Sequence, residues 1–201
     1  MNILAVSDLE SRNFYDYYSP GKLSEFDLII SCGDLHREYL EFLVTMARCP
    51  LIYVHGNHDD NFDKAPPEGC ICIEDDIFIY KGVRFFGLGG SYRYKDSGEH
   101  MYTDRQMYMR AWKAGMKIRK AGGFDVLVTH APAFGIGDSE HISHRGFKVF
   151  LHLMDRYSPR YMLHGHMHMN YGYKVPRTVS YNDTVIINAF EYYKLDYREK
   201  I

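Results

Sequence analysis

Five short apolar segments, each followed within three residues by Asp, Asn or His, constrain this chain more than any other feature. Each segment is too short and too evenly apolar for an amphipathic helix and is typical of a strand buried on both faces. In an open α/β sheet, ligands bind at the carboxyl ends of the strands, so we expect the polar residues that follow to meet at one edge. The segments are Ile3–Val6, Leu28–Ser31, Leu51–His55, Val126–Thr129 and Tyr161–Leu163.

A second group of strands is less regular. Turn residues at Gly82 and at Asn182-Asp183 favour hairpins and antiparallel pairing within it. Apolar segments that alternate with helical patterns predict an α/β protein. The strands of this group are expected at Cys70–Ile73, Ile77–Tyr80, Val83–Leu88, Tyr171–Val175 and Val185–Asn188.

Three helices follow from the spacing of apolar residues. One is expected between Glu38 and Arg48, and another over Phe147–Met154. Thr103 and Gln106 form a capping box for a longer helix that runs to about Lys120 and is stopped by Gly122-Gly123. The chain has 201 residues without a linker or repeat, so we expect one domain over residues 1–201.

Composition excludes several classes of protein. The 24 Lys and Arg residues and 26 Asp and Glu residues give a net charge of −2, which provides no global positive field for nucleic acid or anionic membrane. No apolar stretch approaches the ~20 residues of a membrane span, and the N-terminus does not resemble a signal peptide. The four cysteines include no CxxC pair, which favours reduced thiols in a cytoplasmic protein.

The residues at the strand ends point to metal chemistry. Asp8, Gly33-Asp34, Gly56-Asn57-His58, His130 and Gly165-His166-Met167-His168 each follow one apolar segment. Taken singly, each motif can also be a turn, a helix cap or a packed histidine. Together they offer carboxylate, amide and imidazole donors, which suit Mn²⁺, Fe²⁺ or Zn²⁺ and are too many for one tetrahedral ion. Two ions ~3.5–4 Å apart would clamp both oxygens of a phosphoryl displacement and acidify a bridging water as nucleophile.

At these residues the chain resembles the calcineurin-like metallophosphoesterases, whose motifs span Asp8 to His168. The resemblance implies a four-layer α/β/β/α sandwich of two mixed sheets with a two-metal centre at one edge. It further implies that His58 binds no metal and protonates the leaving group as general acid. By the family's pattern one ion is held by Asp8, Asp34 and His168, and the other by Asp34, Asn57, His130 and His166.

The first motif departs from the family pattern, because Glu10 stands where the family usually has histidine. We expect Glu10 to bind the first ion through oxygen, which gives that site a third carboxylate and favours Mn²⁺ or Mg²⁺ over Zn²⁺. Alternatively, Glu10 points away and the first ion is weakly held or absent. Mn²⁺ is the expected metal, with Fe, Zn²⁺ and Mg²⁺ as the other candidates.

Substrate contacts are harder to predict than metal ligands. His144 and Arg145 stand at the expected start of a helix and are candidates to bind a phosphate, although His144 and Ser143 would also serve as plain caps. Arg93 is a third candidate, and the tyrosines beside it could flank a base or an aromatic leaving group. His55 and His164 are expected to be packed or to support ligands. No role is predicted for His36, His100, His141 and His152.

The related protein serine/threonine phosphatases carry an Asp and an Arg that are missing from the stretch 33–39 of this chain. We therefore expect the small phosphodiesterase branch, with Asp59 either orienting His58 or acting as a turn residue. The alternatives are a phosphomonoesterase on the same centre, a nuclease, or a scaffold without catalysis. No clear arginine pair supports the first and no basic stripe supports the second, and only Glu10 supports the third. A small phosphate ester is the expected substrate, and no protein partner is implied.

Overall fold

Two mixed sheets form the centre of the protein in the computed structural model, which describes residues 1–59, 61–96, 98–169 and 176–198. Both sheets have parallel strands at their centre and an antiparallel strand at an edge. The first sheet has the order β13 (Glu191–Asp196), β1 (Asn2–Ser7), β2 (Leu28–Ser31), β3 (Leu51–Tyr53) and β4 (Ile71–Cys72). The second has the order β11 (Thr178–Tyr181), β12 (Thr184–Asn188), β10 (Tyr161–His164), β9 (Val126–Thr129), β6 (Val83–Leu88) and β5 (Ile77–Tyr80).

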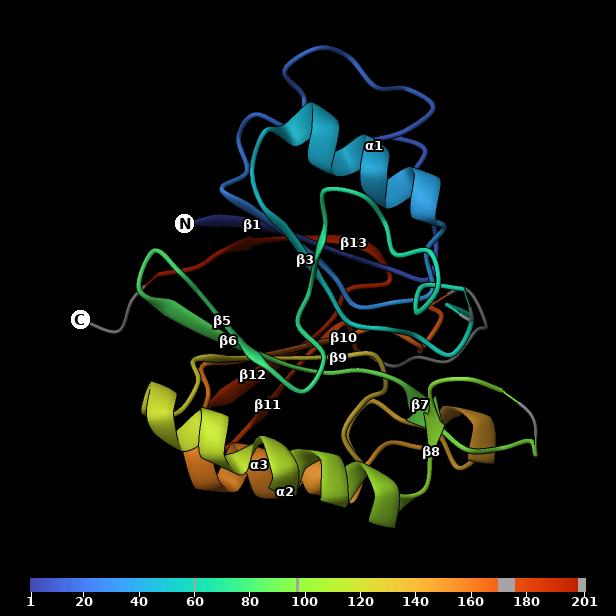
Figure 1. Ribbon diagram of the computed structural model, residues 1–201, viewed down its shortest axis with the longest axis vertical. Coiled ribbons are helices and arrows are strands. Elements are labelled where there is room, and N and C mark those ends of the chain that lie inside the picture. Colours follow the sequence, from blue (N-terminus) through green and yellow to red (C-terminus); the bar gives the residue numbers. More distant parts are fainter. Residues whose placement is uncertain (60, 97, 170–175, 199–201) are drawn as a thin grey trace.

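Helices cover the outer face of each sheet, so the layers run helix, sheet, sheet, helix (Figure 1). The helix α1 (Arg37–Ala47) packs on the first sheet, while α2 (Asp104–Ala121) and α3 (Lys148–Tyr157) pack on the second. A further apolar cluster lies between the two sheets. This arrangement confirms the predicted α/β/β/α sandwich. In the part of the chain that the structure describes, no helix is long and apolar enough to cross a membrane.

The central strands are buried on both faces because each face packs against a different layer. In β2, Leu28 and Ile30 join the cluster between the sheets, whereas Ile29 joins the cluster under α1. In β9, Val126 and Val128 likewise face the other sheet, and Leu127 faces the helices. Since side chains alternate along a strand, both faces demand apolar residues, and the sequence therefore shows continuous apolar segments.

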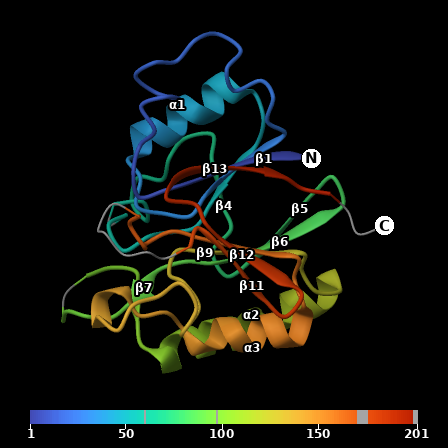
Figure 2. The ribbon, with the colours of Figure 1, turned by 180° about the vertical axis from the view of Figure 1, so that it is seen from behind.

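Most predicted elements are present within one or two residues, and the differences have physical reasons. The strands β11 and β13 were not predicted; both lie at sheet edges and carry exposed polar residues, so they show no apolar segment (Figure 2). The irregular strands do not form a separate group, because β6 and β12 pair in parallel with β9 and β10. The strand expected at Tyr171–Val175 lies outside the described residues.

The ends of the helices follow the predicted local signals only in part. Thr103 and Gln106 form the predicted capping box of α2, and Gly122 ends the helix in the left-handed conformation. The helix α3 begins at Lys148 rather than near His144. Residues Ile142–His144 instead form a separate 3₁₀ turn, η1.

One partly buried carboxylate, Glu74, connects the loop after β4 to α2. It accepts hydrogen bonds from the backbone N–H groups of His55 (2.9 Å) and Gly89 (3.1 Å), and it forms an ion pair with Arg110. Burial raises the pKa of Glu74, but the hydrogen bond with His55 and the charge of Arg110 outweigh burial and lower that pKa to about 2. Ionised Glu74 therefore stabilises the folded state.

We expect Glu74→Gln to lower the free energy of unfolding at pH 7 by about 3 kcal/mol, the equivalent of this pKa shift. The folded pKa lies below the unfolded one, so the wild-type advantage is complete above about pH 4.5 and is lost as the pH falls towards 2. Urea denaturation at several pH values measures it. Glu68→Gln, at a carboxylate with an 85% exposed side chain, is the control and should shift stability by less than ~1 kcal/mol.

Candidate metal centre

Loops that follow strands of both sheets meet at one edge of the sandwich. The loops after β1, β2 and β3 come from the first sheet, and those after β9 and β10 come from the second. Together with two neighbouring segments they surround a cavity of about 430 Å³. The described residues that line it are Asp8, Asp34, Asn57, His58, Tyr94, Ser143, His144, His166 and His168.

Glycines allow these loops to approach one another more closely than side chains would permit. A Cβ atom at Gly56 would collide with the carboxylate of Asp34, and one at Gly165 would collide with the hydroxyl of Ser7. The strand-end residues are also tightly turned: Asp8 (φ 62°), Asp34 (φ 57°) and His166 (φ 65°) adopt the left-handed conformation. Because non-glycine residues seldom adopt this conformation, its occurrence at three predicted ligands is typical of a functional site.

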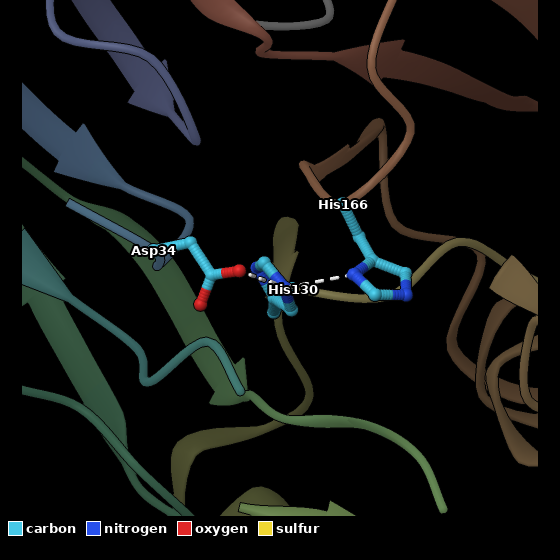
Figure 3. Close-up of side chains that lie close together, drawn as sticks. All are labelled: Asp34, His130 and His166. Atoms are coloured by element: carbon cyan, nitrogen blue, oxygen red, sulfur yellow. Dashed lines mark hydrogen bonds and ion pairs between the residues drawn. The ribbon is translucent and has the colours of Figure 1, made fainter. Parts of the chain in front are cut away.

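Three potential ligand atoms converge on Nε2 of His130. The His130 ring lies between Asp34 and His166 (Figure 3). His130 Nε2 is 3.4 Å from Asp34 Oδ2, 3.2 Å from Asn57 Oδ1 and 3.1 Å from His166 Nδ1. The other ring nitrogens are engaged, since His130 Nδ1 lies 2.8 Å from the carbonyl oxygen of Cys32 and His166 Nε2 lies 2.5 Å from that of Ser143. When both rings are neutral, His130 Nδ1 and His166 Nε2 carry the protons and donate to these carbonyls. The lone pairs of His130 Nε2 and His166 Nδ1 then face each other.

This convergence of lone pairs attracts positive charge. Burial alone would lower the pKa of His130, but the Asp34 carboxylate outweighs it and raises that pKa to about 10. Burial also raises the pKa of Asp34, yet His130 holds it well below its usual range. Burial and the nearby His130 charge lower the pKa of His166 to about 3, so His166 stays neutral. The donor set of Asp34, His130 and His166 therefore fits a divalent cation in place of the proton.

Backbone N–H groups hold the carboxylates in position. Asp34 Oδ1 accepts from the N–H of His58 (2.8 Å), and Asp8 accepts from the N–H of His166 (2.8 Å to Oδ2). His168 Nε2 lies 3.5 Å from Asp8 Oδ1. Two predicted ligands of the first ion, Asp8 and His168, thus lie side by side.

Asp59 serves the loops rather than the ring of His58. Its Oδ2 atom accepts hydrogen bonds from the backbone N–H groups of Gly56 (2.7 Å) and Asp34 (3.0 Å). Burial and the neighbouring Asp34 charge raise the pKa of Asp59 to about 6. Of the two roles considered for Asp59, the structure favours the turn residue.

Glu10 points away from the cavity. Its Oε1 atom lies 2.8 Å from Nδ1 of His36, and Glu10 is not among the described lining residues. This geometry differs from the expected ligation by Glu10 and matches the alternative in which Glu10 does not ligate. It also gives His36, for which no role was predicted, a partner in Glu10.

The two arginines predicted as substrate contacts are engaged elsewhere. Arg93 donates to the carbonyl of Met101 (3.1 Å) and lines a different cavity. Arg145 lies 3.4 Å from Asp104 and stacks against Tyr92, with 4.7 Å between the guanidinium carbon and the ring centroid. Neither arginine lines the cavity. Arg93 is held by the carbonyl of Met101, and Arg145 is held by Asp104.

Four further residues line the cavity, of which two were predicted as site residues and two were not. His58 and His144 line it, but His144 belongs to η1 and gains nothing from the N-terminus of α3. Ser143 was considered only as a cap, whereas its carbonyl orients His166. That contact joins residues 23 positions apart, and no local pattern signals it. Tyr94 was noted only as one of several tyrosines near Arg93, and the structure places it on the cavity wall.

Comparison with known proteins shows the family. A model of the calcineurin-like phosphoesterases matches residues 1–170, so the chain belongs to that family. The UPF0046 protein K07C11.7 of Caenorhabditis elegans is 27% identical, and the match covers 81% of this chain. The chain spans 62% of the length of that curated relative.

Solved structures share the fold at low sequence identity. The protein TT1561 of Thermus thermophilus is 14% identical with a TM-score of 0.62, over 94% of this chain and 89% of that one. The phosphopantetheinyl hydrolase PptH of Mycobacterium tuberculosis is 16% identical with a TM-score of 0.57, over 94% and 88% of the two chains. These similarities confirm the fold of the predicted family.

The close approach at Gly165 gives a test of the loop geometry. We expect Gly165→Ala to lower the free energy of unfolding by about 1–3 kcal/mol through overpacking and to weaken Mn²⁺ binding, because the new methyl group displaces Ser7 and Asp8. Calorimetry and metal analysis measure these effects. Gly115→Ala is the matched control: Gly115 lies in α2 with open space around it, and alanine there should stabilise by about 0.5–1 kcal/mol. Unchanged metal affinity in Gly165→Ala would contradict the proposed role of the close contact.

Proposed function

We propose that the protein is a metal-dependent phosphodiesterase that cleaves a small organic phosphate ester. The observation that carries this proposal is the convergence of Asp34, Asn57, His130 and His166 donor atoms at a cavity that His58 also lines. A cavity of about 430 Å³ has room for a small ester. The near-neutral charge of the chain argues against a nucleic acid polymer as substrate.

Two divalent ions are proposed for the donors around the cavity. Asp8, Asp34 and His168 would hold one ion, and Asp34 would bridge to the second. When bound, such a pair polarises the phosphoryl oxygens and lowers the pKa of a water molecule. Mn²⁺ is proposed because the donors are oxygen and nitrogen atoms without a thiolate, with Fe, Zn²⁺ and Mg²⁺ as alternatives. The second ion would be held by Asp34, Asn57, His130 and His166.

His58 is proposed as the general acid. Its backbone N–H is fixed by Asp34, while its exposed ring lines the cavity. The ring is thus anchored beside the donor set and remains open to solvent, from which it can be reprotonated. In this role His58 delivers a proton to the departing oxygen.

The lining of the cavity favours a diester over a monoester. A monoester dianion carries one more negative charge than a diester and calls for additional cationic side chains. Among the described lining residues there is no Arg or Lys, and Arg93 and Arg145 are bound elsewhere. Tyr94 supplies an aromatic surface at the same cavity, which suits an aromatic or heterocyclic substituent on the ester.

We expect chelator-stripped protein to hydrolyse bis-p-nitrophenyl phosphate only after Mn²⁺ is restored. The same assay with p-nitrophenyl phosphate should give a lower kcat/KM. A higher value for the monoester would favour the phosphomonoesterase. A protein that binds one metal ion or none and turns over neither substrate would favour the inactive scaffold. The outward position of Glu10 is the observation that supports this alternative. Parallel reconstitution with Fe²⁺, Zn²⁺ and Mg²⁺ identifies the preferred metal.

Removal of the proposed acid tests the mechanism. We expect His58→Ala to lower kcat by roughly 10²–10⁴, the usual contribution of general acid catalysis, with Mn²⁺ content unchanged. His152→Ala removes an exposed histidine of α3 and should leave both quantities unchanged. Full kcat in His58→Ala would exclude His58 as the acid.

A further inference from the structure

A second group of potential metal ligands lies apart from the centre described above. It consists of His55, Asp63 and His100, whose ligand atoms all lie within 4.8 Å of one another. His55 Nε2 is 3.8 Å from Asp63 Oδ1, and His100 Nε2 is 3.7 Å from Asp63 Oδ2. None of these three residues lines the first cavity.

His100 carries two signs of a constrained, unsatisfied position. Its backbone is in the left-handed conformation (φ 51°), which is uncommon for a residue with a side chain. Its side chain is only 9% exposed, yet its Nε2 atom has no hydrogen-bond partner among the described residues. Because buried polar atoms are normally paired, this nitrogen lacks a partner that a bound ligand can supply.

The backbone fixes the two histidines beside each other. The carbonyl of His55 accepts from the N–H of Gly90 (2.7 Å), and the carbonyl of His100 accepts from the N–H of Ser91 (3.0 Å). A Cβ atom at Gly90 would lie 2.5 Å from the carbonyl oxygen of His100, so a glycine is needed for this approach. As a result the two imidazole rings stack, with centroids 4.2 Å apart and planes 3° from parallel.

Acidic residues surround the histidines. Glu74 Oε1 lies 3.6 Å from Nδ1 of His55, on the side of the ring opposite Asp63. A carboxylate at the second nitrogen of a histidine is the arrangement that orients metal-binding imidazoles. The group opens to a cavity of about 410 Å³ that Asp75 and Glu99 also line. Since Arg110 is already paired with Glu74 and Asp75, the net charge around the cavity favours a cation.

We propose that His55, His100 and Asp63 form a second metal site, which binds Zn²⁺ through two imidazole Nε2 atoms and one carboxylate, with a fourth position open to the cavity. Two imidazoles and a carboxylate are ligands that Zn²⁺ accepts in tetrahedral geometry. Ligand bonds of ~2.0–2.1 Å place neighbouring donors ~3.4 Å apart. The observed 3.8 and 3.7 Å run to the two different oxygens of Asp63. Ligation therefore requires a rotation of the exposed Asp63 carboxylate and a tilt of the stacked rings.

An ion at this position would connect two segments of the first cavity. His55 and Asp63 lie on either side of Asn57 and His58 in the sequence. His100 follows the cavity residue Tyr94 by six positions. The proposed Zn²⁺ therefore acts as a structural link between the segment of the proposed acid and the aromatic wall. It shares no ligand with the proposed catalytic ions.

Zinc binding by variants of the full chain tests this site. Chelator-stripped wild type is titrated with Zn²⁺ in a calorimeter, alongside His100→Asn and Asp63→Asn. Asparagine tolerates the left-handed conformation of residue 100, and the Asp63 side chain is 62% exposed, so both variants should fold. We expect each variant to bind one Zn²⁺ fewer per chain than wild type, whereas the exposed-histidine control His152→Asn binds as many.

Repeating the titration in a His130→Ala background distinguishes this site from the proposed catalytic centre. The loss of one Zn²⁺ caused by His100→Asn should persist there. The Co²⁺ spectrum of His130→Ala minus that of the His130→Ala/His100→Asn double variant should show the visible absorption of a tetrahedral ion. Equal Zn²⁺ stoichiometry in wild type, His100→Asn and Asp63→Asn would overturn the proposal. So would a loss that disappears in the His130→Ala background, because the ion would then belong to the first centre.

Discussion

The protein is organised around a cluster of electron-pair donors that requires positive charge. The lone pairs of Asp34, Asn57 and His166 all face Nε2 of His130, so in the absence of an ion the cluster holds a proton strongly and raises the pKa of His130 to about 10. Atoms that carry lone pairs repel one another, and burying them together without a partner costs free energy. The packing of two sheets, together with carbonyl groups that fix the second ring nitrogens, holds them in place.

The sandwich is essential because the donors come from both sheets. Asp34 and Asn57 follow strands of the first sheet, whereas His130 and His166 follow strands of the second. A single sheet would bring only half of them to one edge. The apolar cluster between the two sheets sets the distance between the sheets. Glycines such as Gly56 allow the loops to approach one another at the edge.

The distribution of charged side chains also shapes the first cavity. Arg145 is paired with Asp104, and Arg110 is paired with Glu74, so neither guanidinium group is directed at the donors. Positive charge at the cavity is therefore left to bound cations and to histidines. This environment supports the proposed diester substrate, which carries one negative charge at phosphorus, whereas a dianion would need more compensation.

The sequence by itself determined the family, the central strands, the helices and the group of polar residues at the strand ends, because buried parallel strands give continuous apolar segments and their carboxyl ends meet at one edge. Tertiary structure alone decided the outward position of Glu10, the role of Ser143, the engagement of Arg93 and the pairing of His55 with His100. Those features depend on contacts between residues distant in sequence and on side-chain directions, which local patterns do not encode.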